Sequence, residues 1–125
     1  MALDNQYLNQ CIEDCLACYQ ECLGCIPHCL ALGGEHAEQK HITLLMECAQ
    51  ICQLSASVMK LKGSFAFEHC QVCAQVCDAC AESCNNIDAK DEVMRNCAEM
   101  CRQCASSCRN MGKYTEEPYQ SSYEG

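Results

Sequence analysis

The chain has 125 residues, which is enough for one domain built around one core. Half of the residues are apolar, but 17 are cysteine, only two are phenylalanine and none is tryptophan, so an ordinary hydrophobic core would be short of bulk. A formal net charge of −9 argues against nucleic acid or an anionic membrane as a partner.

The start of the chain shows neither the basic region nor the apolar region of a secretion signal. No apolar stretch approaches the roughly 20 residues that a membrane-spanning helix needs. We therefore expect a cytoplasmic protein, in a compartment where thiols stay reduced. In that setting a cysteine-rich chain is expected to bind metal rather than to form disulfides.

Four helices are predicted, and they are separated by turn-forming residues. In chain order they cover residues 4–32, 35–62, 65–85 and 89–111. The second break contains Ser64 and the third contains Asp88, and each is a candidate N-cap for the helix that follows. Pro27 removes a backbone donor inside the first helix, so we expect that helix either to kink there or to end near Ile26.

Short connections between the helices make consecutive helices antiparallel. The predicted fold is therefore all-α, an antiparallel up-down-up-down four-helix bundle with a cysteine-lined core. This metal-storage domain covers residues 1–111. Residues 112–125 lack an apolar period and are expected to form a flexible tail.

The cysteines follow a heptad pattern, with steps of three and four residues in the first, third and fourth predicted helices and one step of four in the second. Residues at these steps share one face of a helix, the face that normally carries leucine or isoleucine toward a partner helix. The 17 positions are Cys11, Cys15, Cys18, Cys22, Cys25, Cys29, Cys48, Cys52, Cys70, Cys73, Cys77, Cys80, Cys84, Cys97, Cys101, Cys104 and Cys108.

The same frame extends to other residues that can bind metals. In the second helix it reaches His41, Leu45, Ser55 and Met59, and in the fourth it reaches Met94 and Met111. His41, Met59, Met94 and Met111 are therefore additional candidate ligands, together with His36 near the start of the second helix. For each histidine, a solvated surface position is as good an interpretation. Met59 and Met111 could equally be apolar plugs.

A cysteine seam without metal would be a poor core. Cysteine is small, and the space that it leaves destabilises a core by about 24 cal/mol per Å³ of cavity. One or two buried cysteines can be inert packing, but 17 in a single frame are not explained that way. Bound metal would fill the space and neutralise the thiolates.

Copper(I) suits continuous thiolate ladders best. Soft thiolates select Cu(I), zinc or iron–sulfur clusters. Structural zinc sites are discrete sets of four ligands, and the compact cysteine run that is typical of bacterial iron–sulfur sites is absent from the sequence. A zinc or cadmium buffer like a metallothionein and an iron–sulfur or thiol redox protein remain as alternatives. No positioned base, nucleotide loop or substrate pocket is apparent, so we do not expect an enzyme.

The four cysteine-lined segments resemble the bacterial cytosolic copper storage proteins over about residues 7–111. The resemblance implies a bundle that holds many Cu(I) ions in multinuclear thiolate clusters, with all 17 cysteines as ligands, and assembly as a homotetramer. We also expect copper to be delivered by a carrier protein or a small thiol. The chain departs from the pattern in having only two cysteines on its second helix, which puts the copper capacity near Leu45 and Ser55 in question.

The antiparallel order also predicts which candidates meet at each end of the bundle. One end gathers Cys29, His28, His36, His41 and Met94, and the other gathers Cys11, Met59, His69, Cys70, Cys108 and Met111. The end with more histidine is the expected route for copper. A second apolar stripe on the first helix would flank the core or face another protomer. It comprises Ile12, Leu16, Tyr19, Leu23, Ile26 and Leu30.

Overall fold

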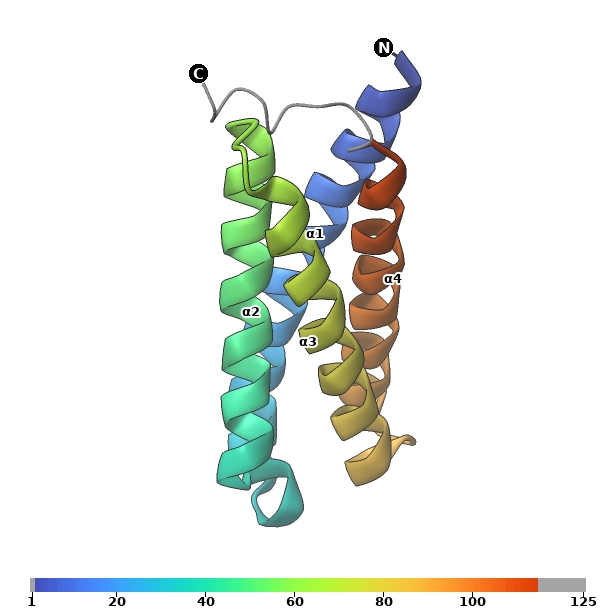
Figure 1. Cartoon of the computed structure of the whole chain (residues 1–125). Helices are drawn as coiled ribbons and strands as arrows, with labels where there is room; N and C mark the ends of the chain where they lie inside the picture. The colour runs from blue at the N-terminus through green and yellow to red at the C-terminus, as the bar shows by residue number, and fades with distance from the viewer. Residues whose placement is uncertain (1, 115–125) are drawn as a thin grey trace.

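The protein is a bundle of four long helices, seen in a computed structural model that describes the backbone of residues 2–114 and the side chains of residues 6–111 (Figure 1). The predicted fold is confirmed. The elements in order are α1 (Ala2–Leu32), the short 3₁₀ helix η1 (Gly34–Ala37), α2 (Gln39–Lys60), α3 (Ala66–Asp88) and α4 (Glu92–Tyr114).

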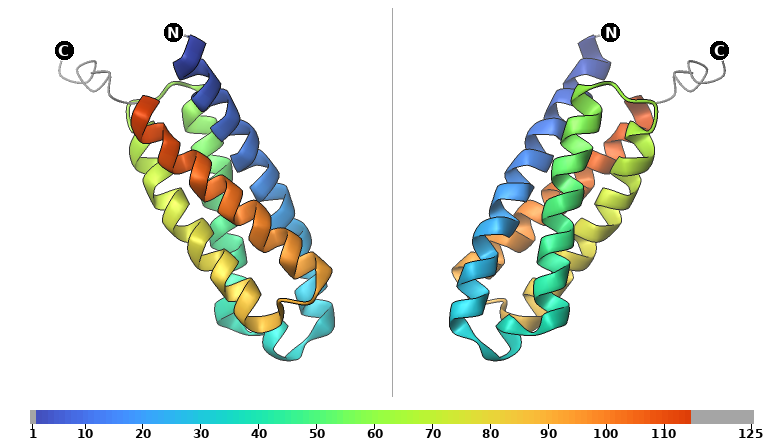
Figure 2. Two further views of the ribbon diagram at one scale, coloured as in Figure 1. Left: turned by 90° about the vertical axis from the view of Figure 1, so that its right-hand side faces the viewer. Right: turned by 90° about the vertical axis from the view of Figure 1, so that its left-hand side faces the viewer.

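Each helix packs on two neighbours, and consecutive helices run in opposite directions (Figures 1 and 2). Helix α1 contacts α2 and α4, and α3 contacts the same two helices, so α1 and α3 lie diagonally across the core. All four helices therefore present a face to one central space. Both ends of the described chain lie at the end of the bundle opposite η1 (Figure 2).

The first connection differs from the prediction. Gly33 and Gly34 have φ angles of 72° and 57°, in the left-handed region that favours glycine. The Gly33 amide donates to the Cys29 carbonyl at 3.1 Å and closes α1. The next residues form η1 instead of the first turn of a helix, so α2 starts at Gln39 and not at residue 35. Sequence periodicity alone does not distinguish this tight turn from an α-helical one.

The caps of the last two helices also differ from the prediction. Phe65, not Ser64, precedes α3, and no side chain caps that helix. Helix α3 runs through the predicted break to Asp88, whose carboxylate accepts hydrogen bonds from the amides of Lys90 and Asp91 in the connection. The carboxylate that caps α4 belongs to Asp91, which accepts from the Met94 amide at 2.9 Å.

Pro27 does not end the first helix, because α1 continues to Leu32. The ring lies on an exposed face, so the missing hydrogen bond is on the solvent side of α1. At the other end of the domain, α4 extends three residues into the predicted tail, to Tyr114. The rest of that tail lies outside the described residues.

The core consists almost wholly of sulfur and small side chains. All 17 cysteines are at most 1% exposed. Buried alanines at positions such as Ala49, Ala74 and Ala105 lie among them. Because alanine and cysteine are both small, the helix backbones can approach closely around a narrow sulfur-lined interior.

The apolar stripe on α1 stays largely outside this core. Leu16, Leu23 and Leu30 are 43%, 44% and 55% exposed, while Ile12, Tyr19 and Ile26 are partly buried. The outward-facing residues are therefore available for contacts that the single chain does not make.

Two helical stretches are long and apolar enough to cross a membrane by length and composition, Gln6–Leu32 and Gln39–Lys60. This corrects the expectation that no stretch approaches that length. The core helices of a globular bundle meet the same criterion, and here cysteine supplies much of the apolar character while facing the interior. Length and composition alone are therefore weak evidence that these helices cross a membrane.

Candidate metal centre

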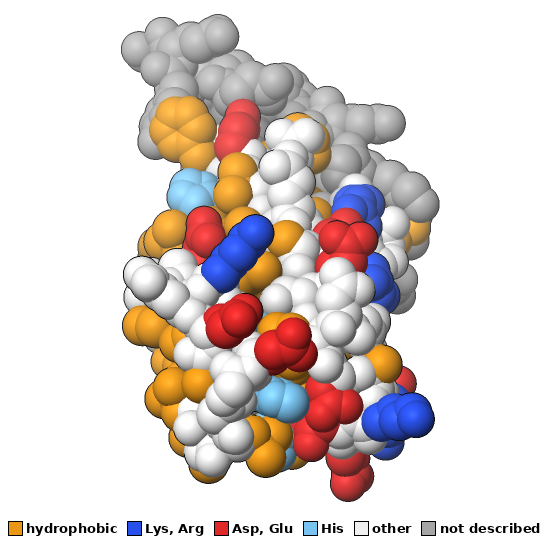
Figure 3. Space-filling model, turned by 90° about the horizontal axis from the view of Figure 1, so that it is seen from below, with side chains coloured by type: hydrophobic (Ala, Val, Ile, Leu, Met, Phe, Trp, Pro, Cys, Tyr) orange, Lys and Arg blue, Asp and Glu red, His pale blue; other side chains and the backbone are white. Residues whose placement is uncertain are grey.

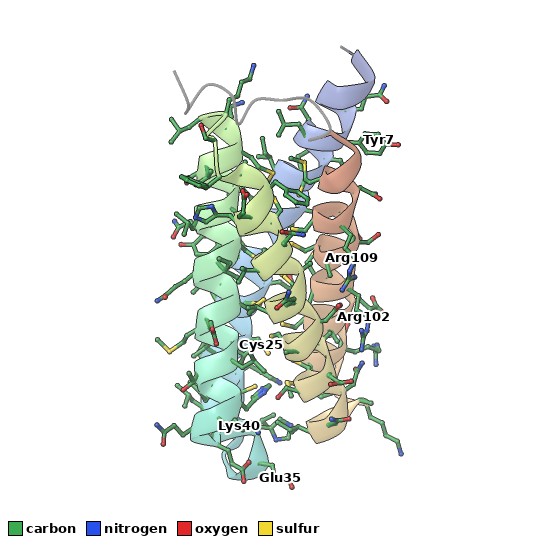
Figure 4. All side chains as sticks on the ribbon, in the orientation of Figure 1. Tyr7, Cys25, Glu35, Lys40, Arg102 and Arg109 are labelled. Atoms are coloured by element: carbon green, nitrogen blue, oxygen red, sulfur yellow. The ribbon has the colours of Figure 1, made fainter. Side chains whose placement is uncertain are left out.

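The seventeen thiols form one continuous internal array. All of them are free and buried. Sulfur atoms from different helices lie 3.6–4.0 Å apart, as in Cys15 to Cys104 at 3.6 Å and Cys18 to Cys48 at 4.0 Å. Figure 4 shows sulfur atoms between the ribbons along the bundle, with Cys25 labelled among them. A disulfide needs an S–S distance of about 2.05 Å, so these contacts are between thiols.

The centre of the array draws on all four helices. Cys48 of α2 lies 3.7 Å from Cys77 of α3 and 3.9 Å from Cys101 of α4. Cys101 in turn lies 3.7 Å from Cys18 of α1. One turn away, Cys52 lies 3.6 Å from Cys77 and 3.8 Å from Cys104. The two cysteines of α2 are therefore enough to bring its face into the middle of the array.

Several sets of sulfur atoms lie close enough together to share one ion. The members of each set are within 4.8 Å of one another. Four of these sets contain four cysteines each and one contains three. Five of the six sets are Cys15, Cys73, Cys104 and Cys108; Cys18, Cys22, Cys48 and Cys101; Cys18, Cys52, Cys77 and Cys104; Cys22, Cys80, Cys97 and Cys101; and Cys11, Cys70 and Cys108.

Neighbouring sets share members, so the sites are not separate. Cys18, Cys22, Cys101, Cys104 and Cys108 each belong to two sets. A thiolate in two sets would bridge two ions. This is the arrangement of a multinuclear cluster, and it differs from an isolated structural site closed by four ligands of its own.

The sulfur spacing matches what a bound metal requires. With a metal–thiolate bond of about 2.3 Å, as for zinc, three sulfurs around one ion lie about 4.0 Å apart and four lie about 3.8 Å apart. The shortest contacts, 3.6–4.0 Å as for Cys52 with Cys77 and Cys18 with Cys48, fit either geometry, while other members of a set lie up to 4.8 Å apart. Spacing alone therefore supports metal binding and does not select the metal.

His41 and Met94 join Cys29 at the η1 end of the array. The Cys29 sulfur lies 3.4 Å from the Met94 sulfur and 3.5 Å from His41 Nε2. His41 Nδ1 lies 2.8 Å from the Ser83 hydroxyl, which holds the other ring nitrogen toward the thiol. Burial lowers the pKa of His41, so the ring is neutral and able to bind a metal near neutral pH. We call Cys29, His41 and Met94 the mouth cluster.

The opposite end of the array is closed by methionine. The Cys70 thiol lies 3.5 Å from the Met59 sulfur, and Met59 and Met111 are fully buried. Cys11 and Cys108 lie 3.7 Å apart in the same region. Met59 and Met111 thus lie at the end where the antiparallel order of the helices places them. The thioether of Met59 lies next to one of the last thiols of the array.

His36 lies outside the array. Its Nε2 is 3.1 Å from the carboxylate of Asp88, and His28 pairs in the same way with Asp91 at 2.8 Å. The His36 pair joins η1 to the last residue of α3, and the His28 pair joins α1 to the residue before α4. His69, at the other end, contacts the Phe65 carbonyl at 2.8 Å. Among the four histidines, only His41 has a contact with a cysteine in the described side chains.

The interior offers no positive charge to balance thiolates. Every Lys and Arg between residues 6 and 111 is exposed, and Arg102 and Arg109 point outward from α4 in Figure 4. Burial raises the pKa of the Cys29 thiol, because an isolated thiolate would lose its hydration. Ionisation of the whole array therefore requires cations that bind inside it.

Two residues that support the mouth cluster are not apparent from the cysteine pattern. Ser83 orients His41, and Asp91 caps α4 immediately before Met94. Ser83 directly precedes Cys84, a frame position, but nothing in the sequence distinguishes it from other polar residues beside the frame. The Asp91 cap could have been found, since Asp three residues before the first frame residue of a helix is a capping signal.

Comparison with known proteins identifies the relatives of this chain. The family model described as copper storage protein matches residues 4–113. The chain belongs to the copper storage protein family. The family takes its name from copper, a metal that soft thiolate ligands select.

Solved structures of relatives have the same fold. The Nmul_A1745 protein of Nitrosospira multiformis is 44% identical, with a TM-score of 0.80 over 87% of this chain and 97% of that one. The Cu(I)-bound copper storage protein BsCsp3 is 36% identical, with a TM-score of 0.77 over 84% and 97%. A cytosolic copper storage protein of Streptomyces lividans with five coppers is 31% identical, with a TM-score of 0.75 over 89% and 96%.

Proposed function

We propose that this protein stores copper as Cu(I), held by the thiolates of its core in multinuclear clusters. The observation that carries the proposal is the continuous array of buried cysteines in which neighbouring four-sulfur sets share members. An array of this kind can bind many ions along one axis. Its chemistry agrees with the membership of the chain in the copper storage family.

Charge balance explains how the interior can be filled. Each Cu(I) that displaces one thiol proton leaves the interior neutral, whatever the number already bound. Because no buried Lys or Arg is present between residues 6 and 111, this neutrality must come from the metal itself. Loading can then proceed along the array without a growing penalty for buried charge.

Thioether sulfurs at both ends of the array favour copper over zinc. Soft sulfur ligands, including methionine, select Cu(I). Met94 lies 3.4 Å from Cys29, and Met59 lies 3.5 Å from Cys70. The four-sulfur sets would also accept zinc or cadmium, so a metallothionein-like buffer is the second candidate.

All 17 cysteines are proposed as copper ligands. His41 and Met94 serve as ligands at one end, and Met59 and Met111 close the other. His36 pairs with Asp88 at the bundle surface and is proposed to bind copper only transiently as it approaches. The domain that performs this function is residues 1–111.

Copper is proposed to enter through the mouth cluster. That end carries histidine and acidic side chains at the surface, as the view from below shows (Figure 3). A carrier protein or a small thiol would deliver Cu(I), which passes to Cys29 as the thiol proton moves to the released carrier sulfur. Further exchange between neighbouring sulfurs 3.6–4.0 Å apart then moves copper along the array.

The proposed setting is the cytosol, where free thiols persist. The Streptomyces lividans relative is described as cytosolic. We also propose that the protein is not an enzyme, since a storage role requires no catalytic group. A homotetramer is also proposed, because Leu16, Leu23 and Leu30 leave a stripe on α1 that a second copy can cover. Sedimentation of the apoprotein and the copper-loaded protein would determine its oligomeric state.

An anaerobic metal titration tests the storage function. The reduced apoprotein is titrated with Cu(I) in the presence of a strong Cu(I) chelator, and in parallel with Zn(II) and Cd(II). Storage requires uptake of many Cu(I) ions per chain against the chelator, and weaker binding of zinc. Saturation at one to four copper ions, or a preference for zinc, would reject the proposal. A brown protein with visible absorption on isolation would instead indicate an iron–sulfur cluster.

A further inference from the structure

Asp14 is a buried carboxylate that the copper array does not use. It lies on α1 beside the cysteine frame and is 5% exposed. One carboxylate oxygen accepts from the side-chain amides of Gln10 at 3.1 Å and Gln103 at 3.0 Å, and the other accepts from the Ser107 hydroxyl. Gln103 and Ser107 belong to α4, so this network joins α1 to α4.

A network of this kind is an inefficient way to stabilise the protein. Burying a carboxylate carries a large desolvation cost, and replacing buried ionic groups by well-packed apolar residues is often neutral or stabilising. No Lys or Arg side chain is among the three groups that donate to Asp14. A role in specifying one arrangement of the helices accounts better for its position.

The cysteine frame by itself does not specify one arrangement of α1 and α4. Cys15 lies 3.6 Å from Cys104 and 3.8 Å from Cys108. If one helix slides by one turn, about 5.4 Å along the axis, Cys15 faces the next frame residues, Cys101 and Cys104. Because the seam repeats the same small side chain every three or four residues, this shifted packing has nearly the same contacts as the native one.

Asp14 distinguishes the native packing from these shifted alternatives. A slide of one turn in one direction brings it beside Glu99 instead of Ser107, and places two carboxylates together. A slide in the other direction exchanges Gln103 for Met111 and leaves one oxygen without a donor. Either change costs free energy, because a buried carboxylate must have its hydrogen-bond partners. Only the native packing gives Asp14 both of its α4 donors.

We propose that Asp14, through Ser107 and Gln103, sets the axial register of α1 against α4. It is a positioning residue, like the single polar group that fixes the register of a coiled coil at some cost in stability. Each of the three residues directly precedes a frame cysteine, namely Cys15, Cys104 or Cys108. The register therefore decides which thiolates of α1 and α4 share an ion, and this consequence rests on the proposed copper function.

The test compares Asp14→Leu with Asp14→Asn in the copper-free protein. Asparagine can accept from the glutamine amides and contact the Ser107 hydroxyl, whereas leucine can do neither. We expect the leucine variant to keep its helix content while its amide NMR spectrum shows more than one set of signals for α1 and α4. The asparagine variant should show a single set with the native contacts between the two helices.

Glu21→Leu is the matched control, because Glu21 occupies the same heptad position one repeat later and is exposed. The double variant Gln103→Leu with Ser107→Val removes the network from the α4 side and should reproduce the effect of Asp14→Leu. A single set of signals with native contacts in both variants would overturn the proposal. Because no metal is present, this result does not depend on whether the protein stores copper.

A second measurement tests the consequence for copper. Under saturating Cu(I), Asp14→Leu should bind fewer copper ions than Glu21→Leu and give broader copper–thiolate absorption bands. Equal stoichiometry and identical spectra in the two variants would reject the link between register and loading. Failure of all variants, and of the unmodified protein, to bind copper would reject the proposed function instead.

Discussion

The middle of the core and its two ends are built differently, although the same cysteine frame runs through both. In the middle, four helices contribute thiols to one set, as with Cys18, Cys52, Cys77 and Cys104. At the ends α2 contributes no cysteine, and histidine or methionine completes the array. The difference indicates that the middle determines how many copper ions the protein holds, and that the ends control the exchange of copper with solvent. Changes to the bound metal, the shared thiols, the end ligands and the pH test that division.

Removing the metal should have the largest effect, because it empties the middle of the core. A structural metal bound by cysteines contributes about 10–16 kcal/mol to folding in zinc-binding peptides, and several ions fill this array. We expect the copper-loaded protein to melt at least about 20 °C above the apoprotein, by ligand linkage. Calorimetry of both forms under anaerobic conditions measures the difference. Equal melting temperatures would show that copper lies outside the core.

Replacing shared cysteines should reduce capacity more than replacing the end methionines. Cys101 and Cys104 each belong to two sets, so Cys101→Ala with Cys104→Ala removes bridges between neighbouring ions. We expect about two or more copper ions to be lost per chain, since each shared thiolate supports two sites. Met59→Leu with Met111→Leu is the matched control at the end and should lose about one ion or none. Chelator competition counts the ions, and equal losses would contradict the division.

Loss of the mouth cluster should slow copper uptake and leave capacity nearly unchanged. His41→Leu with Met94→Leu removes two groups that lie within 3.5 Å of Cys29. We expect the initial rate of Cu(I) uptake to fall about tenfold, as when positioned metal ligands or their supports are lost. Stopped-flow transfer from a Cu(I)–thiol complex gives the rate. A larger effect of Met59→Leu at the opposite end would place the entrance there.

Alkaline pH should weaken the apoprotein by a smaller amount. Burial raises the pKa of Cys29 above the ordinary value of 9.0. Since this raises the folded-state pKa, its contribution to stability is complete below about pH 9 and is lost as the pH rises through the folded value. The melting temperature of the apoprotein should therefore fall as the pH rises above about 9.

The copper-loaded protein provides the control for this pH dependence. Its thiolates are already ionised and neutralised by metal, so its melting temperature should change little over the same interval. Loading at pH 7.5 should also release protons as copper binds, which a pH indicator in weak buffer can count. An unchanged pH during loading would show that the thiols of the apoprotein are already ionised.

Much of the fold and the array follows from the pattern of residues along the chain. The three-and-four spacing predicts helices whose cysteines share a face, and Leu45, Ser55 and Met59 are buried at the frame positions where the pattern places them. Connections are predicted less well. The 3₁₀ turn of η1 and the cap at Asp91 depend on a few local dihedral angles, and α3 continues through a run of residues that often ends a helix.

The sequence by itself determined a four-helix bundle with sulfur inside, because side chains three and four residues apart must lie on one face of a helix. The tertiary structure alone decided which thiols meet. The identical repeats of the seam allow several registers, and the polar contacts of Asp14 with α4 select one. Ser83 likewise turns His41 toward Cys29 from another helix. Such contacts join residues far apart in the chain, so no local pattern encodes them.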